Sequence, residues 1–202
     1  MSSISNRLSR IKSTLSPGVE LVAVSKFHPV EALREAYDAG QRIFGESRVQ
    51  ELLEKIQAMP PDTCWHFIGH LQTNKLKQLI GRVSLIESVD SIRLLDMIDS
   101  LSAERGVASR VLMQVHVAAE ETKFGFLPDE LVAWFASRGF ESLKATHICG
   151  IMGMATNTDD SERIAADFRL IADTRRRILD VAPDLRGFDI LSMGMSDDYP
   201  LA

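Results

Sequence analysis

Short apolar runs alternate with amphipathic segments along the whole chain. Four apolar side chains recur at helical spacing between Ile4 and Leu15, which predicts a helix over residues 4–15. Residues 21–25 then form a run of apolar and small side chains, which is typical of a strand covered on both faces. The same alternation of helix and strand patterns continues to the end of the chain.

Seven strands and seven helices are predicted, with glycine or proline marking many of the boundaries. The predicted strands span residues 21–25, 42–45, 64–69, 83–89, 110–117, 143–152 and 188–194. The predicted helices span residues 4–15, 30–39, 46–59, 73–81, 91–105, 128–139 and 159–181. Strands that alternate with helices at intervals of about 25–30 residues imply a parallel sheet.

Two architectures fit such a sheet, a doubly wound open sheet and a closed barrel of eight β/α units. No Gly-x-Gly-x-x-Gly motif follows the first predicted strand, which argues against the dinucleotide-binding form of the open sheet. In a barrel, the residues that do chemistry lie at the carboxyl ends of the strands. Residues suited to a ligand do follow the predicted strands, namely Lys26, Glu46, Ser47, Gly69, His70, Met152 and the segment 192–196. This pattern favours the barrel.

Lys26 follows directly on the first apolar run and has two interpretations. A solvent-facing lysine is the simpler one, because lysine is seldom fully buried without a partner. The other interpretation is a reactive amine at the mouth of a barrel. The polar residues predicted at the neighbouring strand ends favour this interpretation.

Composition bounds the class of protein. A chain of 202 residues with 45% hydrophobic content predicts one globular domain over residues 1–202. Without a long apolar run, or the apolar core of a signal peptide in the opening segment MSSISNRLSR, we expect a cytoplasmic protein with no membrane span. A net charge of −5 argues against nucleic acid as a partner. Cys64 and Cys149 are predicted to be small buried hydrophobic residues.

No metal site is predicted. His66 and His70 resemble a metal-binding pair, but no carboxylate or cysteine completes the set at a useful spacing. We therefore expect His66 in the core and His70 at the rim of a pocket. Glu120 and Glu121 are expected in a solvated loop.

Four motifs carry a resemblance to a known family. The segments AVSKFHP, FGESRVQE, WHFIGHLQTNK and LSMGMSDD occur in this order and together resemble the pyridoxal phosphate homeostasis protein family, formerly described as alanine-racemase-like. The resemblance implies a single-domain α/β TIM barrel of fold type III that holds pyridoxal 5′-phosphate (PLP) as a Schiff base on Lys26. It also implies a role in vitamin B6, amino-acid and keto-acid homeostasis without robust turnover, so no catalytic residue is assigned.

The resemblance also suggests further cofactor contacts. A phosphate is bound well by backbone N–H groups and hydroxyls, and LSMGMSDD supplies Gly194, Ser192 and Ser196. Ser196 is expected to cap a following helix, with Asp197 and Asp198 pointing outward. Ser47, His70 and Met152 complete the predicted cofactor-binding set, with at least one methionine touching the cofactor ring.

The sequence departs from the family in two places. Ser47 stands where the family usually has asparagine. Family members also continue into an eighth strand, whose arginine and Gly-Thr contact the cofactor, whereas this chain ends at Ala202. We therefore expect seven of eight strands, in an incomplete chain rather than an open barrel.

Three classes of function remain open at this point. A PLP-binding regulator or carrier is favoured, with the cofactor and PLP-dependent apoenzymes as partners and a monomer as the expected state. An alanine-type racemase needs a second acid/base opposite the lysine, and the chain has only Tyr37, in a predicted helix, and Tyr199, beyond the seventh strand. A Schiff-base aldolase would carry its lysine on a middle strand beside an acid/base pair.

Overall fold

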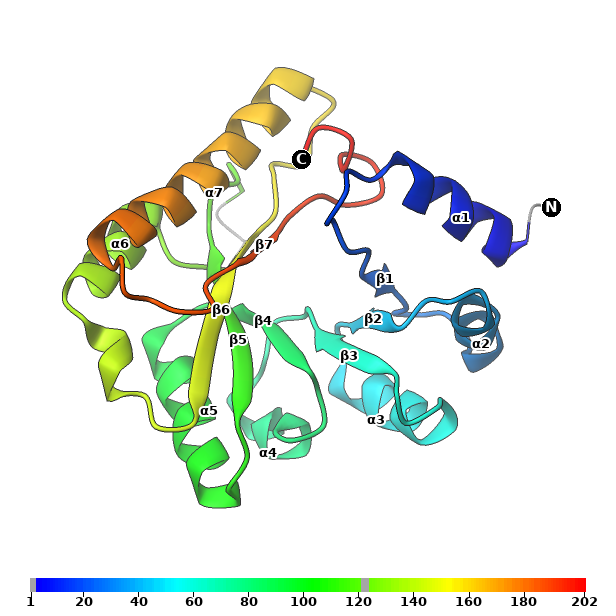
Figure 1. Cartoon of the computed structure of the whole chain (residues 1–202), viewed down its shortest axis with the longest axis horizontal. Coiled ribbons are helices and arrows are strands. Elements are labelled where there is room, and N and C mark those ends of the chain that lie inside the picture. The colour runs from blue at the N-terminus through cyan, green and yellow to red at the C-terminus, as the bar shows by residue number, and fades with distance from the viewer. Residues whose placement is uncertain (1–2, 121–123) are drawn as a thin grey trace.

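Seven parallel strands form one sheet that curls into part of a barrel in the computed structural model, which describes residues 3–120 and 124–202 (Figure 1). Their spatial order is their order along the chain. The strands are β1 (Ala23–Val24), β2 (Ile43–Glu46), β3 (Cys64–Phe67), β4 (Leu85–Val89), β5 (Ser109–Val115), β6 (Thr146–Gly153) and β7 (Ile190–Ser192). A doubly wound sheet would reverse its strand order at a switch point. The predicted barrel class is therefore confirmed.

Helices connect consecutive strands and surround the outer side of the sheet (Figure 1). The α-helices are α1 (Ile4–Thr14), α2 (Val30–Asp38), α3 (Val49–Ala58), α4 (Leu76–Leu79), α5 (Ile92–Arg105), α6 (Pro128–Ala136) and α7 (Ser161–Val181). Two 3₁₀ turns, η1 (Thr73–Lys75) and η2 (Gly139–Ser142), precede α4 and β6. Each predicted strand and helix is present, although β1 has only 2 residues and the helix predicted over 73–81 is divided between η1 and α4.

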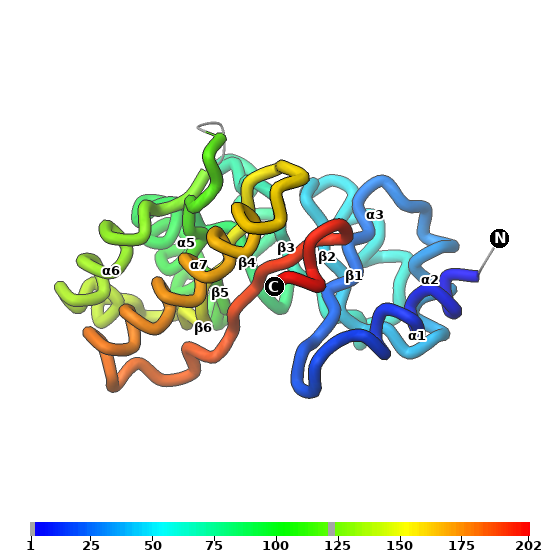
Figure 2. The backbone as a smooth tube through the Cα atoms, turned by 90° about the horizontal axis from the view of Figure 1, so that it is seen from above, coloured from blue at the N-terminus to red at the C-terminus, as the bar shows by residue number. Residues whose placement is uncertain are grey.

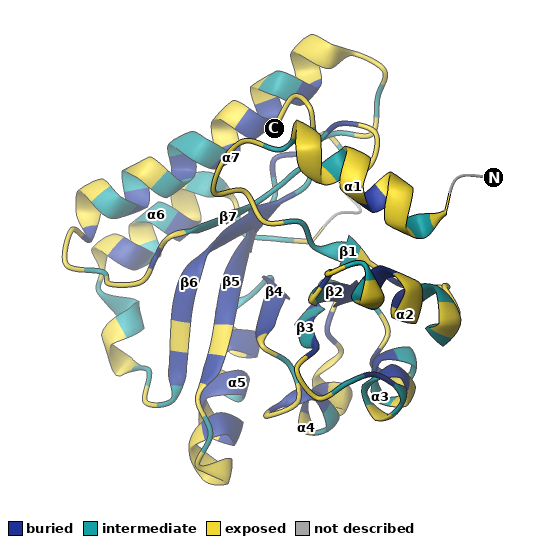
Figure 3. Cartoon of the chain, turned by 45° about the vertical axis from the view of Figure 1, so that its right-hand side comes forward, coloured by how far each residue is buried: buried dark blue, intermediate teal, exposed yellow. Residues whose placement is uncertain are grey.

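The sheet has a core on each face. Val111 and Met113 of β5 belong to the large cluster shared with the helices, whereas Leu112 between them belongs to a separate smaller cluster. The smaller cluster comprises Leu85, Leu112, Cys149 and Met152, with Met154 and Ile190 packed against it. Consecutive strand residues point to opposite faces, so this cluster, which contains no helix residue, lies inside the curl. Figure 3 shows how thoroughly β4, β5 and β6 are buried between the two cores.

Gly150 marks the closest approach of β6 to β7. A Cβ atom added there would lie 1.8 Å from the carbonyl oxygen of Ile190, so only glycine fits. The register between β5 and β6 also shifts at this point. Because of that shift, Cys149 and Met152 face the same interior side although they are an odd number of positions apart.

β1 and β7 are the two edges of the sheet over the described residues. The segment after β7 lies beside the end of α1 in both Figure 1 and Figure 2, and the Tyr199 hydroxyl is 3.3 Å from Thr14 Oγ1. Cys149 is buried as expected, but Cys64 is only partly buried, because it lies at the start of β3 near the surface. None of the described helices has the length and apolar character needed to cross a membrane.

Candidate functional site at the carboxyl ends of the strands

Lys26 lies in the turn that directly follows β1, and it is exposed. Ala23 packs against the helix-side core, whereas Val24 is 47% exposed and belongs to the opposite face. Ser25 returns to the helix side, where its hydroxyl donates to Glu46 Oε1 at 2.6 Å. Lys26 comes next, so this alternation, if continued beyond β1, directs it to the inner side of the curl.

A buried ion pair lies immediately behind this turn. Glu46, the last residue of β2, is 0% exposed, and Lys55 of α3 is 6% exposed. The Lys55 amine donates to Glu46 Oε1 at 2.7 Å and to the Ser25 carbonyl oxygen at 2.8 Å. Glu46 Oε2 has no hydrogen-bond partner among the described residues. The pair thus satisfies its charges largely through one oxygen of Glu46 and the backbone of the turn.

Glu51, one turn before Lys55 on α3, reaches the other side of the same turn. Its Oε2 atom accepts a hydrogen bond of 3.0 Å from the Phe27 N–H group and is 3.5 Å from the Lys55 amine. The bond from Phe27 holds the pKa of Glu51 below its ordinary value, with help from Lys55 and Arg48, although burial acts to raise it. A lowered pKa means that this contact stabilises the fold at neutral pH and is lost as the pH falls through that pKa.

Glu87 joins opposite parts of the curled sheet inside the barrel. Its Oε1 atom is 2.6 Å from His66 Nδ1 on β3, and its Oε2 atom accepts from the Ser192 hydroxyl on β7 at 2.6 Å. Because β7 pairs with β6 and not with β4, this contact spans the interior. His66 is therefore not the plain core residue that the sequence suggested, but part of a buried polar bridge.

His70 lies at the rim with a carboxylate partner. Its Nδ1 atom is 2.9 Å from Asp90 Oδ2, and its ring stacks on Phe124 with the ring centres 3.9 Å apart. His70 is exposed, as a residue at the rim of a pocket would be, and the carboxylate partners of the two histidines were not predicted from the sequence. Over the described residues, no group of three or more His, Cys, Asp or Glu side chains could hold a metal ion.

Ser47 and Gly69 bring the ends of β2 and β3 together. A Cβ atom added to Gly69 would lie 2.2 Å from the Ser47 carbonyl oxygen, so the two backbones are in direct contact. Ser47 is partly buried and His70, next to Gly69, is exposed. Ser47 therefore lies against the residue that precedes His70.

The loop after β7 differs from its predicted form. The Met195 N–H group donates to Asp198 Oδ1 at 2.5 Å, and the Tyr199 N–H group donates to the Met195 carbonyl oxygen at 2.8 Å. Met195 therefore precedes the first turn, and the expected cap at Ser196 is wrong. Asp198 is buried with 7% exposure and does not point outward, whereas Asp197 is exposed. The reason is reciprocal bonding between Met195 and Asp198, as in a capping box.

Two further predicted residues are neighbours across β6 and β7. Met152 pairs in register with Ser192, and Met152 is buried in the interior cluster. Gly194 follows with a φ of +84°, a left-handed conformation that favours glycine. The predicted residues thus lie at or near the carboxyl ends of β1, β2, β3, β6 and β7, which is the end of the strands where barrels bind their ligands.

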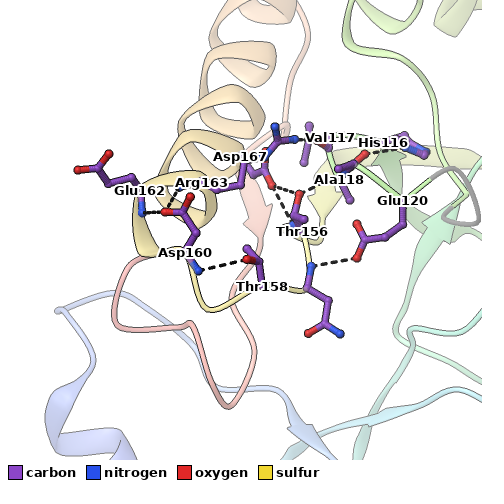
Figure 4. A network of polar contacts seen from close by, with 12 residues as sticks. His116, Val117, Ala118, Glu120, Thr156, Thr158, Asp160, Glu162, Arg163 and Asp167 are labelled. Atoms are coloured by element: carbon purple, nitrogen blue, oxygen red, sulfur yellow. Dashed lines mark hydrogen bonds and ion pairs between the residues drawn. The ribbon is translucent and has the colours of Figure 1, made fainter.

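The loops after β5 and β6 are tied together by Asp167 of α7 (Figure 4). Its Oδ2 atom accepts from the Thr156 N–H group at 2.8 Å and from the Thr156 hydroxyl at 2.6 Å. The same hydroxyl oxygen accepts from the Ala119 N–H group at 3.1 Å. Glu120, expected in solvent, is instead partly buried and accepts from the Asn157 N–H group at 2.9 Å. Glu121 lies outside the described residues.

Three side chains that shape this region, Glu51, Lys55 and Glu87, were not predicted from the sequence, and Asp198 was predicted to point outward. Two of them leave a signal in the sequence. Lys55 falls on the buried face of α3 with Val49 and Leu52, where an apolar residue is usual. Glu87 is the only charged residue in the apolar strand LIESV. A charge in such a place indicates a buried partner.

Comparison with known proteins identifies the family. Residues 1–201 match the model of the alanine racemase N-terminal domain. The chain is 37% identical to the pyridoxal phosphate homeostasis protein of Schizosaccharomyces pombe, over 100% of this chain and 86% of that protein. It is 36% identical to the protein of the same name from Aquifex aeolicus, over 97% of this chain and 89% of the relative.

Solved structures agree with this relationship. PipY of Synechococcus elongatus without PLP superposes with a TM-score of 0.93 at 38% identity, covering 98% of this chain and 92% of PipY. PipY with PLP bound gives a TM-score of 0.88 at 36% identity, with the same coverage. An alanine racemase of Clostridium difficile, 14% identical, shares the fold with a TM-score of 0.76 over 96% of this chain and 50% of the racemase. The chain therefore belongs to the pyridoxal phosphate homeostasis protein family, whose members carry the fold of the alanine racemase N-terminal domain.

Proposed function

We propose that this chain binds PLP and acts in PLP homeostasis, with Lys26 as the residue that attaches the cofactor. The observation that carries the proposal is the placement of Lys26 just beyond the carboxyl end of β1, in a barrel closely similar to that of PipY, which has been solved with PLP bound. The relatives are named for pyridoxal phosphate homeostasis, and a role in amino-acid balance is part of our proposal.

The residues at the strand ends fit such a cofactor. Lys26 offers an exposed amine, and Val24, which is 47% exposed, offers apolar surface for an aromatic ring, whereas Met152 is buried in the interior cluster. Gly194, with its φ of +84°, lets the β7 loop turn closely against Tyr199, and we assign this loop to the phosphate. Asp198 does not oppose an anion there, because its carboxylate is turned into the loop to accept from Met195.

The cofactor supplies an aldehyde that condenses with amines and a ring that withdraws electrons. The chain's own residues bind and orient it. Lys26 acts as the nucleophile when its amine is neutral, and the Ser196 hydroxyl is exposed and available to a phosphate. Ser192 donates its hydroxyl to Glu87, so we assign it to holding the loop through that bond. Ser47 and His70 border the site at the ends of β2 and β3.

The wider setting is also a proposal. An attachment lysine that is exposed leaves its cofactor accessible to a recipient, so we propose PLP-dependent apoenzymes as partners. A monomeric state and a cytoplasmic location complete the proposal; size-exclusion chromatography with light scattering checks the first, and cell fractionation checks the second.

Reductive trapping tests the assignment of Lys26. After incubation with PLP, borohydride should fix one pyridoxyl group per chain, and peptide mapping should locate it on Lys26. Lys26→Ala should abolish the label, because the amine is gone. Lys75→Ala, which removes another exposed lysine, should leave the label in place. A pyridoxyl group on any other lysine of the unaltered protein contradicts the assignment.

Amino-acid racemisation should be slow. The Tyr37 hydroxyl is hydrogen bonded to Asp62, and the Tyr199 hydroxyl lies beside Thr14, so both tyrosines have partners away from Lys26. With L-alanine and PLP, we expect D-alanine to form at well below about one turnover per second, a modest rate for an enzyme. Chiral chromatography measures the product, and a rate above that value would favour the racemase instead.

A further inference from the structure

We infer that Glu51 and Lys55 of α3 are positioning residues, which hold the backbone on both sides of Lys26 and so direct its amine toward the cofactor. The inference rests on the proposed attachment of PLP to Lys26. Neither residue is assigned to touch the cofactor. Both would act through the turn that carries the lysine.

The backbone is held on both sides of Lys26 from the same helix. Before the lysine, the Ser25 carbonyl oxygen accepts from the Lys55 amine at 2.8 Å, while the Ser25 N–H group donates to the Gly45 carbonyl at 2.9 Å. After the lysine, the Phe27 N–H group donates to Glu51 Oε2 at 3.0 Å. Lys26 is thus the one residue between two anchored peptide groups. These anchors fix the direction in which the Cα–Cβ bond of Lys26 leaves the backbone.

Phe27 adopts a conformation that needs such support. Its φ of +65° is a left-handed value, which costs a residue with a Cβ atom about 1–2 kcal/mol. The Arg48 guanidinium lies 4.7 Å from the centre of the Phe27 ring, and Arg48 is also 3.5 Å from Glu51. Strained residues of this kind persist where several surrounding contacts hold them in place, and they are common at functional sites.

The charges of Lys55 and Glu46 indicate a role beyond filling space in the core. Lys55 occupies the buried face of α3, where a leucine or methionine would pack without any loss of hydration. A buried lysine and a buried glutamate must be desolvated, and their attraction only partly offsets that cost. What the pair adds, and an apolar residue would not, is a strong donor aimed at the Ser25 carbonyl oxygen.

Glu51→Ala provides the test, because Glu51 is 25% exposed and its loss should leave the fold intact. The readout is affinity for two probes, PLP and pyridoxine 5′-phosphate, which has the same phosphate and ring but no aldehyde. If Glu51 positions Lys26, affinity for PLP should fall at least tenfold while affinity for pyridoxine 5′-phosphate stays unchanged. The borohydride-trapped fraction at limiting PLP should fall in parallel.

Two variants on the same helix serve as controls. Glu51→Gln keeps an oxygen that accepts from Phe27 and should retain most of the preference for PLP. Glu54→Ala removes an exposed carboxylate of the same helix, and this carboxylate makes no contact with the turn around Lys26 in the bonds described above. This variant should bind both probes like the unaltered protein. These variants separate the hydrogen bond from the charge.

The outcomes are distinguishable. An equal loss of affinity for both probes in Glu51→Ala, or no loss for either, overturns the positioning role while leaving the proposed function standing. An unaltered protein that binds neither probe, or that does not prefer PLP, defeats the proposed function and the positioning role together.

Discussion

Replacement of Lys55 by methionine should lower the free energy of unfolding by about 3–5 kcal/mol, the usual cost of removing one partner from a buried ion pair. Lys55 and Glu46 are 6% and 0% exposed, and the Lys55 amine lies 2.7 Å from Glu46 Oε1. Methionine fills a similar volume, so the loss comes from the carboxylate of Glu46, which would remain buried without a cation. Chemical denaturation followed by circular dichroism measures the change.

The double variant Glu46→Gln/Lys55→Met separates this cause from a general loss of packing. With the buried charge gone as well, much of the stability should return, because replacing a whole buried pair is often nearly neutral. The two substitutions should therefore be strongly non-additive in a double-mutant cycle. If Lys55→Met alone costs less than about 1 kcal/mol, a value typical of exposed ion pairs, then Glu46 is not an uncompensated buried charge.

Glu87→Ala should lower the free energy of unfolding by about 2 kcal/mol, because two partly buried polar groups lose their partner, and an unpaired buried polar group costs about 1–3 kcal/mol. The groups are His66 Nδ1 and the Ser192 hydroxyl, both 2.6 Å from a Glu87 oxygen. The variant also releases β7 and its loop from the opposite strands. We therefore expect weaker PLP binding along with the lower stability, measured by denaturation and by titration.

A double-mutant cycle tests whether the contact between Glu87 and Ser192 causes the loss of stability. Ser192→Ala in the Glu87→Ala background should cost little, because the hydroxyl has already lost its acceptor. Glu104→Ala removes a carboxylate from the exposed surface of α5 and should change the free energy of unfolding by no more than about 0.5 kcal/mol. Additive effects of Glu87→Ala and Ser192→Ala would show that the bridge contributes little to closing the curl.

Much of the fold followed from local patterns. The apolar periodicity predicted every strand and helix, because it reports which side of each segment is covered. Gly106 is a clear example of a boundary signal, since it ends α5 with a left-handed φ of +65°. The division of residues 73–81 into η1 and α4 was not predicted, because the apolar pattern alone does not distinguish a 3₁₀ turn from a short helix.

The loop after β7 shows the limit of local reasoning even over short distances. The segment Met195–Ser196 offers two possible starts for the following turn, and Ser196 is the better cap by residue type. The buried Asp198 instead bonds to the Met195 N–H group, which places the start one residue earlier. The bond made by the buried Asp198 carboxylate therefore outweighed the general preference for a serine such as Ser196 at the cap position.

The order of strands and helices, the family and the placement of Lys26 at a strand end could be predicted, because they depend on spacing along the chain. The partners of the buried charges could not. Lys55 is 9 positions from Glu46, His66 is 21 positions from Glu87, and Ser192 is 105 positions from Glu87. Such contacts depend on how strongly the sheet curls and on the register of its strands. Those two properties arise from the packing of the whole sheet against its helices, and no local spacing encodes them.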